Sequence, residues 1–239
     1  MISQTISPKE IVVVDSGTEE HRTETKDYLN HLGDIGIEIR LVGEKEMQAP
    51  EARNLGASSC TGDYLGFLDD DDEWYPDKLS LQLSLSNGSP AIIYSPYLEE
   101  EKGKFSEYCW ASASYPEILA RNLIGSTSFP LIRKKVFDCV GGFDTEFRTN
   151  QEWDLWIRVL KMYNCVYSQN LAGKKYDVGG LSADDSSRRA GWKMIFRKHR
   201  SDYSKNRTQH NEAAGIFYGD MRNRGNIMGV LESLIEKLR

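Results

Sequence analysis

The amino-acid sequence predicts an α/β fold in which helices flank a mainly parallel, twisted sheet, followed by a helical C-terminal extension. Short β-branched runs alternate with helix-like segments over roughly the first hundred residues, which is the pattern of βαβ units. The 239 residues, 39% of them hydrophobic, suffice for one sizeable core. The last part of the chain reads as helical and more polar. We therefore expect one domain at 1–182 and a helical extension at 183–239.

The individual elements follow from periodicity and from stop signals. Each expected strand is a short apolar run closed by polar or turn residues, and two helices are expected to begin close to a proline. An amphipathic helix is expected near Glu152, and the polar residues at 99–104 and 112–114 suggest loops. The expected strands are 10–15, 37–42, 63–68, 91–94 and 129–132, and the expected helices are 19–32, from 50, from 76, and 152–163.

Composition excludes several classes of protein. The net charge of -6 argues against bulk nucleic-acid binding. No run approaches the ~18 apolar residues of a membrane-spanning helix. The four cysteines are scattered and form no Cys-x-x-Cys pair, so neither a disulfide framework nor a zinc site is expected, and a reducing cytoplasm is the expected compartment.

An acidic run follows the third expected strand. Asp69 to Asp72 are consecutive aspartates, and Glu73 comes next. Such carboxylates repel one another unless they face water or hold a cation. An EF-hand calcium loop does not fit, because its sixth position would be Trp74 rather than glycine. Two interpretations remain: a solvated turn before the next helix, or a site for Mn²⁺ or Mg²⁺ that also binds phosphate oxygens.

Four segments, taken in order, resemble motifs of the family 2 inverting glycosyltransferases, which have the GT-A fold, a Rossmann-like fold that binds nucleotide-sugars. The acidic run and its flanks resemble the metal-binding segment, Ala52-Arg-Asn-Leu-Gly56 resembles the preceding helix, and two further stretches resemble the base-binding and acceptor-side segments. The resemblance covers residues 1–182. The matching segments are 9–18, 52–56, 67–79, and 140–147 with 151–158.

The resemblance implies roles on the donor side. Asp15 would contact the base or ribose, and Arg53 the uracil side or a phosphate. Asp69 and Asp70 would reach the ribose and help to shape the metal site. Asp71 would hold the metal that bridges the diphosphate, with Asp69 beside it.

The resemblance also implies an acceptor-side base. Glu152 falls where the family places its general base, usually an aspartate, and Asp154 is the alternative. The implied activity is transfer of a sugar from a UDP-sugar to the hydroxyl of a saccharide or lipid-linked acceptor, as in polysaccharide biosynthesis. One metal assists the leaving group and one carboxylate takes the proton. The alternative is a non-catalytic module that binds a sugar nucleotide or a partner.

The sequence departs from the family pattern at its beginning, where the family's first strand has no counterpart. We expect the strand at 10–15 to have an unpaired side, an open pocket near Asp15, and a tendency to dimerise through that edge. Relatives also carry a metal-binding histidine where this chain offers only Asp177.

A basic segment lies near the C-terminus. Residues 186–207 contain eight Lys or Arg and one acidic residue, a net +7 within a total of -6. The cations are interleaved with Trp192, Ile195 and Phe196, which suits a helix lying peripherally on the inner face of an anionic membrane. The alternative, which we favour, is that the apolar side chains pack on the catalytic domain and the cations stay in water.

Overall fold

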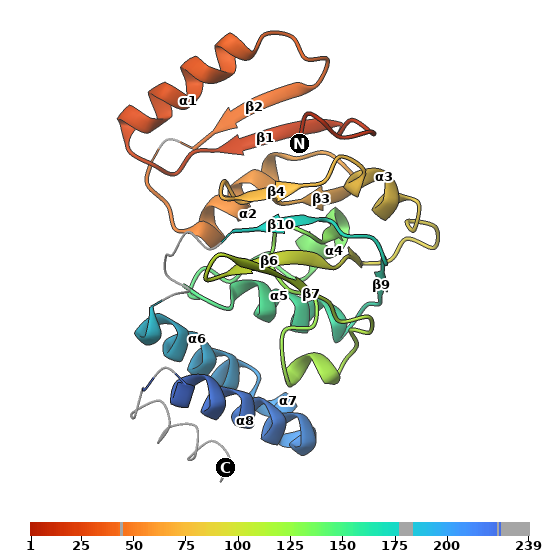
Figure 1. The fold of residues 1–239 in the computed structure, drawn as a ribbon, viewed down its shortest axis with the longest axis vertical. Coiled ribbons are helices and arrows are strands. Elements are labelled where there is room, and N and C mark those ends of the chain that lie inside the picture. Colours follow the sequence, from red (N-terminus) through yellow and green to blue (C-terminus); the bar gives the residue numbers. More distant parts are fainter. Residues whose placement is uncertain (44, 177–183, 224, 226–239) are drawn as a thin grey trace.

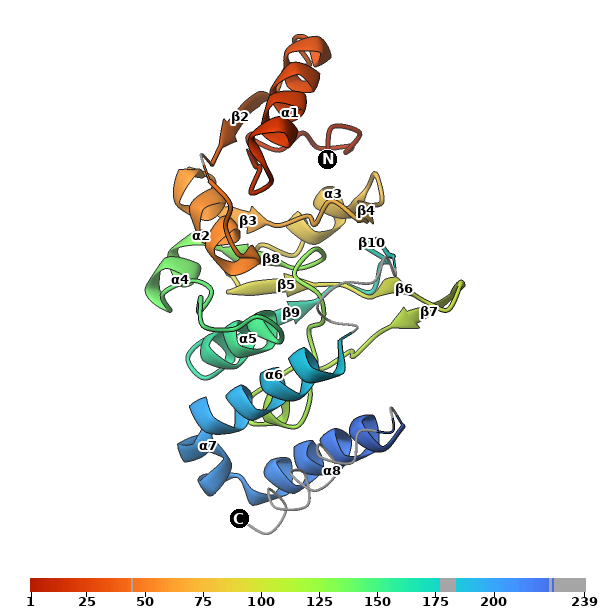
Figure 2. The ribbon, with the colours of Figure 1, turned by 90° about the vertical axis from the view of Figure 1, so that its left-hand side faces the viewer.

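The computed structural model describes residues 1–43, 45–176, 184–223 and 225. A small β–α–β unit lies at one end, two four-stranded sheets occupy the middle, and α6–α8 lie at the other end (Figure 1). The side view shows the same order, with α5 (Gln151–Leu160) between the central sheet and α6 (Asp185–Lys198) (Figure 2). The α/β fold class expected from the sequence is confirmed.

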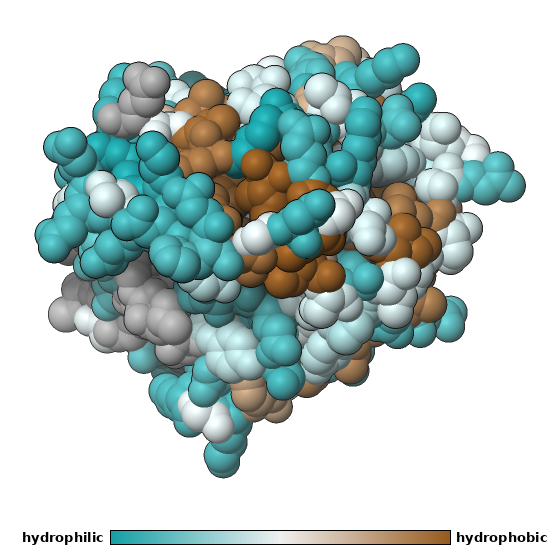
Figure 3. All heavy atoms as spheres, turned by 90° about the horizontal axis from the view of Figure 1, so that it is seen from above, coloured by the Kyte–Doolittle hydropathy of each residue, from teal (hydrophilic) through white to brown (hydrophobic). Residues whose placement is uncertain are grey.

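The N-terminal unit consists of β1 (Glu10–Val14), α1 (Glu19–Leu32) and β2 (Glu38–Val42). β1 and β2 pair in parallel. Among the described strands β1 has no other partner, and its residues line a large cavity. No hydrophobic side chain of residues 1–43, which are all described, is buried. Apolar side chains accordingly show between hydrophilic ones when the molecule is seen from above (Figure 3).

The central sheet has the strand order β3-β8-β5-β9. β5 and β9 are parallel, but β8 runs antiparallel to both β3 and β5. The pairing is therefore more mixed than the expected, mainly parallel arrangement, because β8 enters after a long connection rather than after a crossover helix. The strands are β3 (Tyr64–Gly66), β5 (Ile92–Tyr94), β8 (Leu131–Arg133) and β9 (Cys165–Tyr167).

The second sheet has the order β4-β10-β6-β7. β6 and β7 form an antiparallel hairpin that turns at Lys102 and Gly103, both with positive φ. Our expectation of a loop at 99–104 was wrong, because this run of charged residues lacks the alternation of a half-buried strand and yet pairs as a hairpin. The strands are β4 (Asp72–Trp74), β6 (Tyr97–Glu101), β7 (Lys104–Tyr108) and β10 (Gly173–Lys175).

The largest core cluster surrounds the amphipathic helix α5, whose side chains include Leu155 and Trp156, both almost fully buried. Trp153 is also buried and donates its indole N–H to the Ile118 carbonyl, so it is a core residue. The helices packed around the sheets are α2 (Ala49–Ser59), α3 (Lys78–Leu83), the 3₁₀ turn η1 (Glu117–Leu119), α4 (Lys134–Cys139) and α5 (Gln151–Leu160).

The C-terminal extension begins with α6 (Asp185–Lys198), α7 (Arg200–Lys205) and α8 (Arg207–Asn223). Trp192, Ile195 and Phe196 are buried in the main core cluster, so the expected packing of the apolar side chains is confirmed and they are not free to enter a membrane. The cations do not all stay in water, because Arg188 pairs with Asp220 and Lys198 pairs with Asp144 and Asp154. Of the described helices, none has the length and apolar character needed to cross a membrane.

Candidate active site

A cavity of about 1750 Å³ is lined by the whole of β1 and β3 and extends to the residues that follow their carboxyl ends. It brings together groups from distant parts of the chain: Asp15 after β1, Arg53 on α2, the acidic residues after β3, and Glu152 on α5. Ligands of α/β sheets bind at strand ends of this kind. The cavity is therefore the candidate site.

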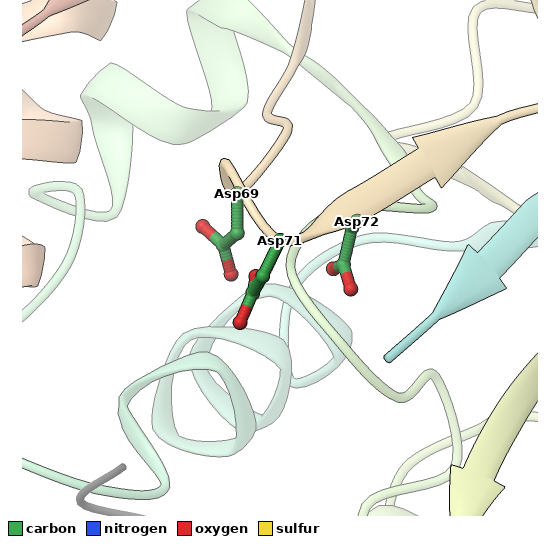
Figure 4. A group of neighbouring side chains, drawn as sticks. All are labelled: Asp69, Asp71 and Asp72. Atoms are coloured by element: carbon green, nitrogen blue, oxygen red, sulfur yellow. The ribbon is translucent and has the colours of Figure 1, made fainter. Parts of the chain in front are cut away.

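Three of the acidic residues converge. Each of Asp69, Asp71 and Asp72 offers a carboxylate oxygen, and these oxygens all lie within 4.8 Å of one another. Figure 4 shows the three side chains pointing to the same side of the loop between β3 and β4. Asp70 is exposed and outside this group, although it borders the cavity.

The electrostatics of this group favour a cation. Burial and the neighbouring Asp69 and Asp71 carboxylates raise the pKa of Asp72 to about 6, and burial together with Asp69 raises the pKa of Asp71. Asp72 Oδ1 is buried without a hydrogen-bond partner. Clustered carboxylate oxygens, one of them unsatisfied, fit a hard divalent ion such as Mg²⁺ or Mn²⁺. That Asp71 and Asp69 bind the metal stays a prediction.

The donor side of the cavity is formed by Asp15 and Arg53. Asp15 accepts hydrogen bonds from the Gly17 N–H (2.9 Å) and the Thr25 hydroxyl. Partial burial raises the pKa of the Asp15 carboxyl, but these hydrogen bonds outweigh it and the net pKa is lowered. Arg53 donates from Nε (3.2 Å) and Nη2 (2.6 Å) to Asp69 Oδ1, while its Nη1 is buried without a partner. A free guanidinium donor of this kind suits a phosphate or a carbonyl oxygen.

Two neighbours of Arg53 explain why α2 holds it there. Gly56 lies so close to β1 that an added Cβ would be 2.9 Å from Val14 Cγ2. Asn54 exchanges two hydrogen bonds with the Phe143 backbone, at 2.8 and 2.9 Å. Glycine thus permits the close approach of α2 to β1, and the asparagine ties α2 to the segment before α5.

Glu152 lies in the first turn of α5 and lines the cavity. Burial raises the pKa of its carboxyl, against the opposing charges of Arg53 and Lys175. Asn122 Nδ2 donates to Glu152 Oε1 at 3.5 Å. A half-buried carboxylate with a raised pKa at a cavity wall has the character of a general base.

Asp154, the alternative base, does not face the cavity. Its side chain is fully buried and accepts hydrogen bonds from Arg158 Nε (2.8 Å), Lys198 Nζ (2.9 Å) and His199. These partners hold the pKa of Asp154 at about 2 despite its burial. The residue therefore ties α5 to α6, and the structure does not place it where an acceptor could bind.

Lys175 and Glu99 belong to the site but escaped the sequence analysis. Across β10, Lys175 pairs with Asp72 of β4 and with Glu99 of β6, and its Nζ lies 2.6 Å from Glu99 Oε1. Burial alone would lower the pKa of Lys175. The negative charges of Glu99, Glu152 and Asp72 outweigh this effect, so the net pKa is raised. No local pattern marks either residue, because their juxtaposition depends on sheet pairing. The suggested metal ligand Asp177 lies outside the described residues.

Comparisons with known proteins agree with this geometry. A sequence model of glycosyl transferase family 2 matches residues 1–144. The chain is 30% identical over 182 residues to an uncharacterised glycosyltransferase of Rickettsia felis, covering 71% of this chain and 29% of that protein. It is 33% identical over 139 residues to the amylovoran biosynthesis glycosyltransferase AmsB of Erwinia amylovora, covering 53% and 46%. The chain thus spans less than two thirds of either relative.

Among solved structures, the chain resembles S. aureus TarS, with a TM-score of 0.65 at 12% identity over 92% of this chain and 39% of that one. A shorter TarS crystallised with UDP gives a TM-score of 0.64 at 13% identity, covering 92% and 65%. At this level of identity the likeness concerns the fold.

Proposed function

The chain belongs to glycosyl transferase family 2, and from this premise we propose that it transfers a sugar, with inversion, from a nucleotide-sugar donor to an acceptor hydroxyl. The observation that carries the proposal is that the three clustered aspartates and Glu152 line one cavity. This arrangement supports two separate roles: a cation that stabilises the charge of the leaving group, and a carboxylate that takes the proton of the acceptor hydroxyl.

The donor is a UDP-sugar. S. aureus TarS, which shares the fold, was crystallised with UDP and with UDP-GlcNAc. In this chain Asp15 would contact the base or ribose, and Arg53 would use its unpartnered Nη1 for the uracil side or a phosphate. Asp70, which lines the cavity, would reach the ribose together with Asp69. The AmsB relative is named as a glycosyltransferase of amylovoran biosynthesis, which supports a role in polysaccharide biosynthesis. A saccharide or lipid-linked acceptor stays a prediction.

In the reaction, the acceptor oxygen attacks the anomeric carbon and the bond from that carbon to the diphosphate oxygen breaks. Glu152 takes the proton of the acceptor hydroxyl, and burial, which raises its pKa, makes it a stronger proton acceptor than an exposed carboxylate. Asp69, Asp71 and Asp72 would hold Mn²⁺ or Mg²⁺, which when bound supplies positive charge to the leaving diphosphate. Arg53 adds a permanent cation beside Asp69.

The metal is tested by binding rather than turnover. Calorimetry of UDP with the wild type should show binding with Mn²⁺ or Mg²⁺ and little binding in EDTA, and Asp71→Ala should abolish the metal-dependent part. Asp138→Ala, at an exposed site on α4, serves as the control. Equal UDP affinity with and without EDTA would contradict the proposal.

One observation favours the alternative, a non-catalytic sugar-nucleotide-binding module: the donor-side unit β1–α1–β2 contributes no buried hydrophobic side chain. A screen of nucleotide-sugars for Mn²⁺-dependent hydrolysis separates the two functions. Metal-dependent binding without hydrolysis or transfer of any donor would favour the alternative.

The setting of the enzyme is a further proposal. We expect the protein in the cytoplasm, in contact with the inner membrane face through the cations of residues 186–207 rather than through apolar side chains. Self-association through the edge of β1 likewise stays a prediction.

A further inference from the structure

One short segment, residues 122–128, contacts both the proposed base, Glu152, and the acidic loop of the candidate site. Its first residue, Asn122, reaches Glu152, and its last, Ser128, reaches Asp69 in the acidic loop. Asn122, Gly125 and the residues at 126 and 127 also line the cavity. The segment belongs to none of the motifs that resemble the family.

At the first end, hydrogen bonds to backbone groups of the same segment hold the side-chain amide of Asn122 in place. Its Oδ1 accepts hydrogen bonds from the N–H groups of Gly125 (2.9 Å) and Ile124 (3.3 Å). Its Nδ2 is therefore oriented and donates to the Gly125 carbonyl (3.2 Å) and to Glu152 (3.5 Å). A held donor of this kind orients the carboxylate that it contacts.

At the other end, Ser128 is fully buried beneath the acidic loop. Its hydroxyl accepts a hydrogen bond from the Asp69 N–H at 3.1 Å, and its presence beside the Asp72 carboxyl moderates the rise of the pKa of that group. Its carbonyl accepts a hydrogen bond from Trp74 Nε1 at 2.5 Å, and the Trp74 ring lies 4.0 Å from the buried ammonium of Lys78. One serine thus fixes the start of the loop and the strand that follows it.

The middle of the segment cannot shift easily. Gly125 has a φ of +90°, and an added Cβ would lie 2.7 Å from Tyr97 Oη and 2.9 Å from Tyr108 Cε1. The Gly125 carbonyl accepts a hydrogen bond from Trp156 Nε1 at 3.1 Å, which ties the segment to the helix that carries Glu152. Only glycine suits such a position.

We propose that residues 122–128 are a positioning segment that sets the separation between Glu152 and the cation-binding carboxylates, with Asn122 orienting the base and Ser128 orienting the acidic loop. This inference rests on the proposed function. A displacement of around 1 Å between reacting groups is enough to slow a reaction by about 10²-fold, so a rigid spacer between two such groups has a catalytic consequence.

The Ser128 end is tested with Mn²⁺ alone, by titration followed by electron paramagnetic resonance. Ser128→Ala should weaken Mn²⁺ binding about tenfold or more, as loss of a partner behind a metal ligand commonly does, and Asn122→Ala should leave it unchanged. Ser168→Ala is the matched control, because Ser168 is equally buried, its hydroxyl has no partner, and it does not line the cavity. Equal Mn²⁺ affinity in Ser128→Ala and the wild type would overturn the inference.

The Asn122 end is tested with the UDP-sugar that the wild type hydrolyses. Asn122→Ala should lower kcat about tenfold with little change in KM, whereas excess Mn²⁺ should restore much of the Ser128→Ala activity. If both variants lose kcat and Mn²⁺ affinity together, in proportion to a lower unfolding temperature, the segment is only structural and the inference is wrong. A wild type that binds no Mn²⁺ or hydrolyses no donor would instead contradict the proposed function.

Discussion

The N-terminal unit and the part of the molecule from α2 onward are built with similar elements but packed differently. In residues 1–43 no hydrophobic side chain is buried, although β1 is a run of β-branched residues, and α1 has no buried residue at all. From α2 onward, by contrast, the described core includes Ile92, Leu155 and Trp156, each at most 1% exposed. Local sequence therefore suffices to specify a βαβ unit, but not to bury it.

The comparison divides the candidate site. Asp15, on the donor side, is carried by the loosely packed unit, whereas the acidic loop and Glu152 are carried by elements anchored in the cores. Regions with few buried apolar contacts open at low free-energy cost. We therefore expect the donor-base side to adapt to its ligand and the chemical side to be formed in advance.

The largest effect is expected from a matched pair of leucine truncations. Leu155→Ala, at a fully buried position on α5, should lower the free energy of unfolding by about 3–4 kcal/mol because it leaves a cavity in the core. Leu41→Ala, on the half-buried β2, should cost about 1 kcal/mol. Urea unfolding of both variants measures the difference. Similar costs would show that the N-terminal unit is as firmly packed as the rest.

Kinetic and binding measurements should distinguish the role of Glu152 from that of Asp15. Glu152→Gln should lower kcat by about 10²-fold or more and leave UDP binding nearly unchanged, because it removes only the proton acceptor. Asp15→Asn should instead weaken UDP binding about tenfold with kcat nearly kept. Steady-state kinetics with calorimetry distinguish the two. If Asp154→Asn lowered kcat with UDP affinity and stability intact, the base would have been misassigned.

The ionic network of the packed part predicts an acid dependence. The pKa of Asp154 is lowered from 3.8 to about 2 in the folded protein, so its stabilisation is present above about pH 4 and is lost as the pH falls from about 4 to 2. Asp154→Asn should therefore cost about 2 kcal/mol at pH 7, and the difference from the wild type should narrow toward pH 2. Unfolding midpoints at pH 7, 5 and 3 test this. If the difference in stability between the wild type and Asp154→Asn stayed constant with pH, the ionisation of Asp154 would not account for the stabilisation.

The smallest effect is expected at the basic surface of α6. Because its apolar residues are buried, we expect only weak, salt-sensitive binding to anionic vesicles, carried by the cations of residues 186–207. Flotation with neutral and anionic liposomes, at low and high salt, measures it. Equal binding to neutral and anionic liposomes would contradict the proposed membrane contact.

The sequence by itself determined the order of the elements that carry Asp15, Arg53, the acidic loop and Glu152, but it did not indicate β4, β6, β7, β9, β10 or α4. The β-branched run before Asp15, the proline near the start of α2 and the spacing of apolar residues on α5 act locally, so these elements were predicted to within a few residues. The motif order also indicated which residues would gather, and the cavity does bring Asp15, Arg53 and Glu152 to one place.

Only the tertiary structure decided which neighbours these residues have. Lys175 joins the site because β10 pairs with both β4 and β6. Asp154 is withdrawn from it because Arg158, Lys198 and His199 surround its carboxylate. Ser128 became visible only as the buried partner of Asp69. Such contacts join segments 50 or more residues apart in several cases, and no local propensity encodes them, because they follow from how the sheets and helices pack.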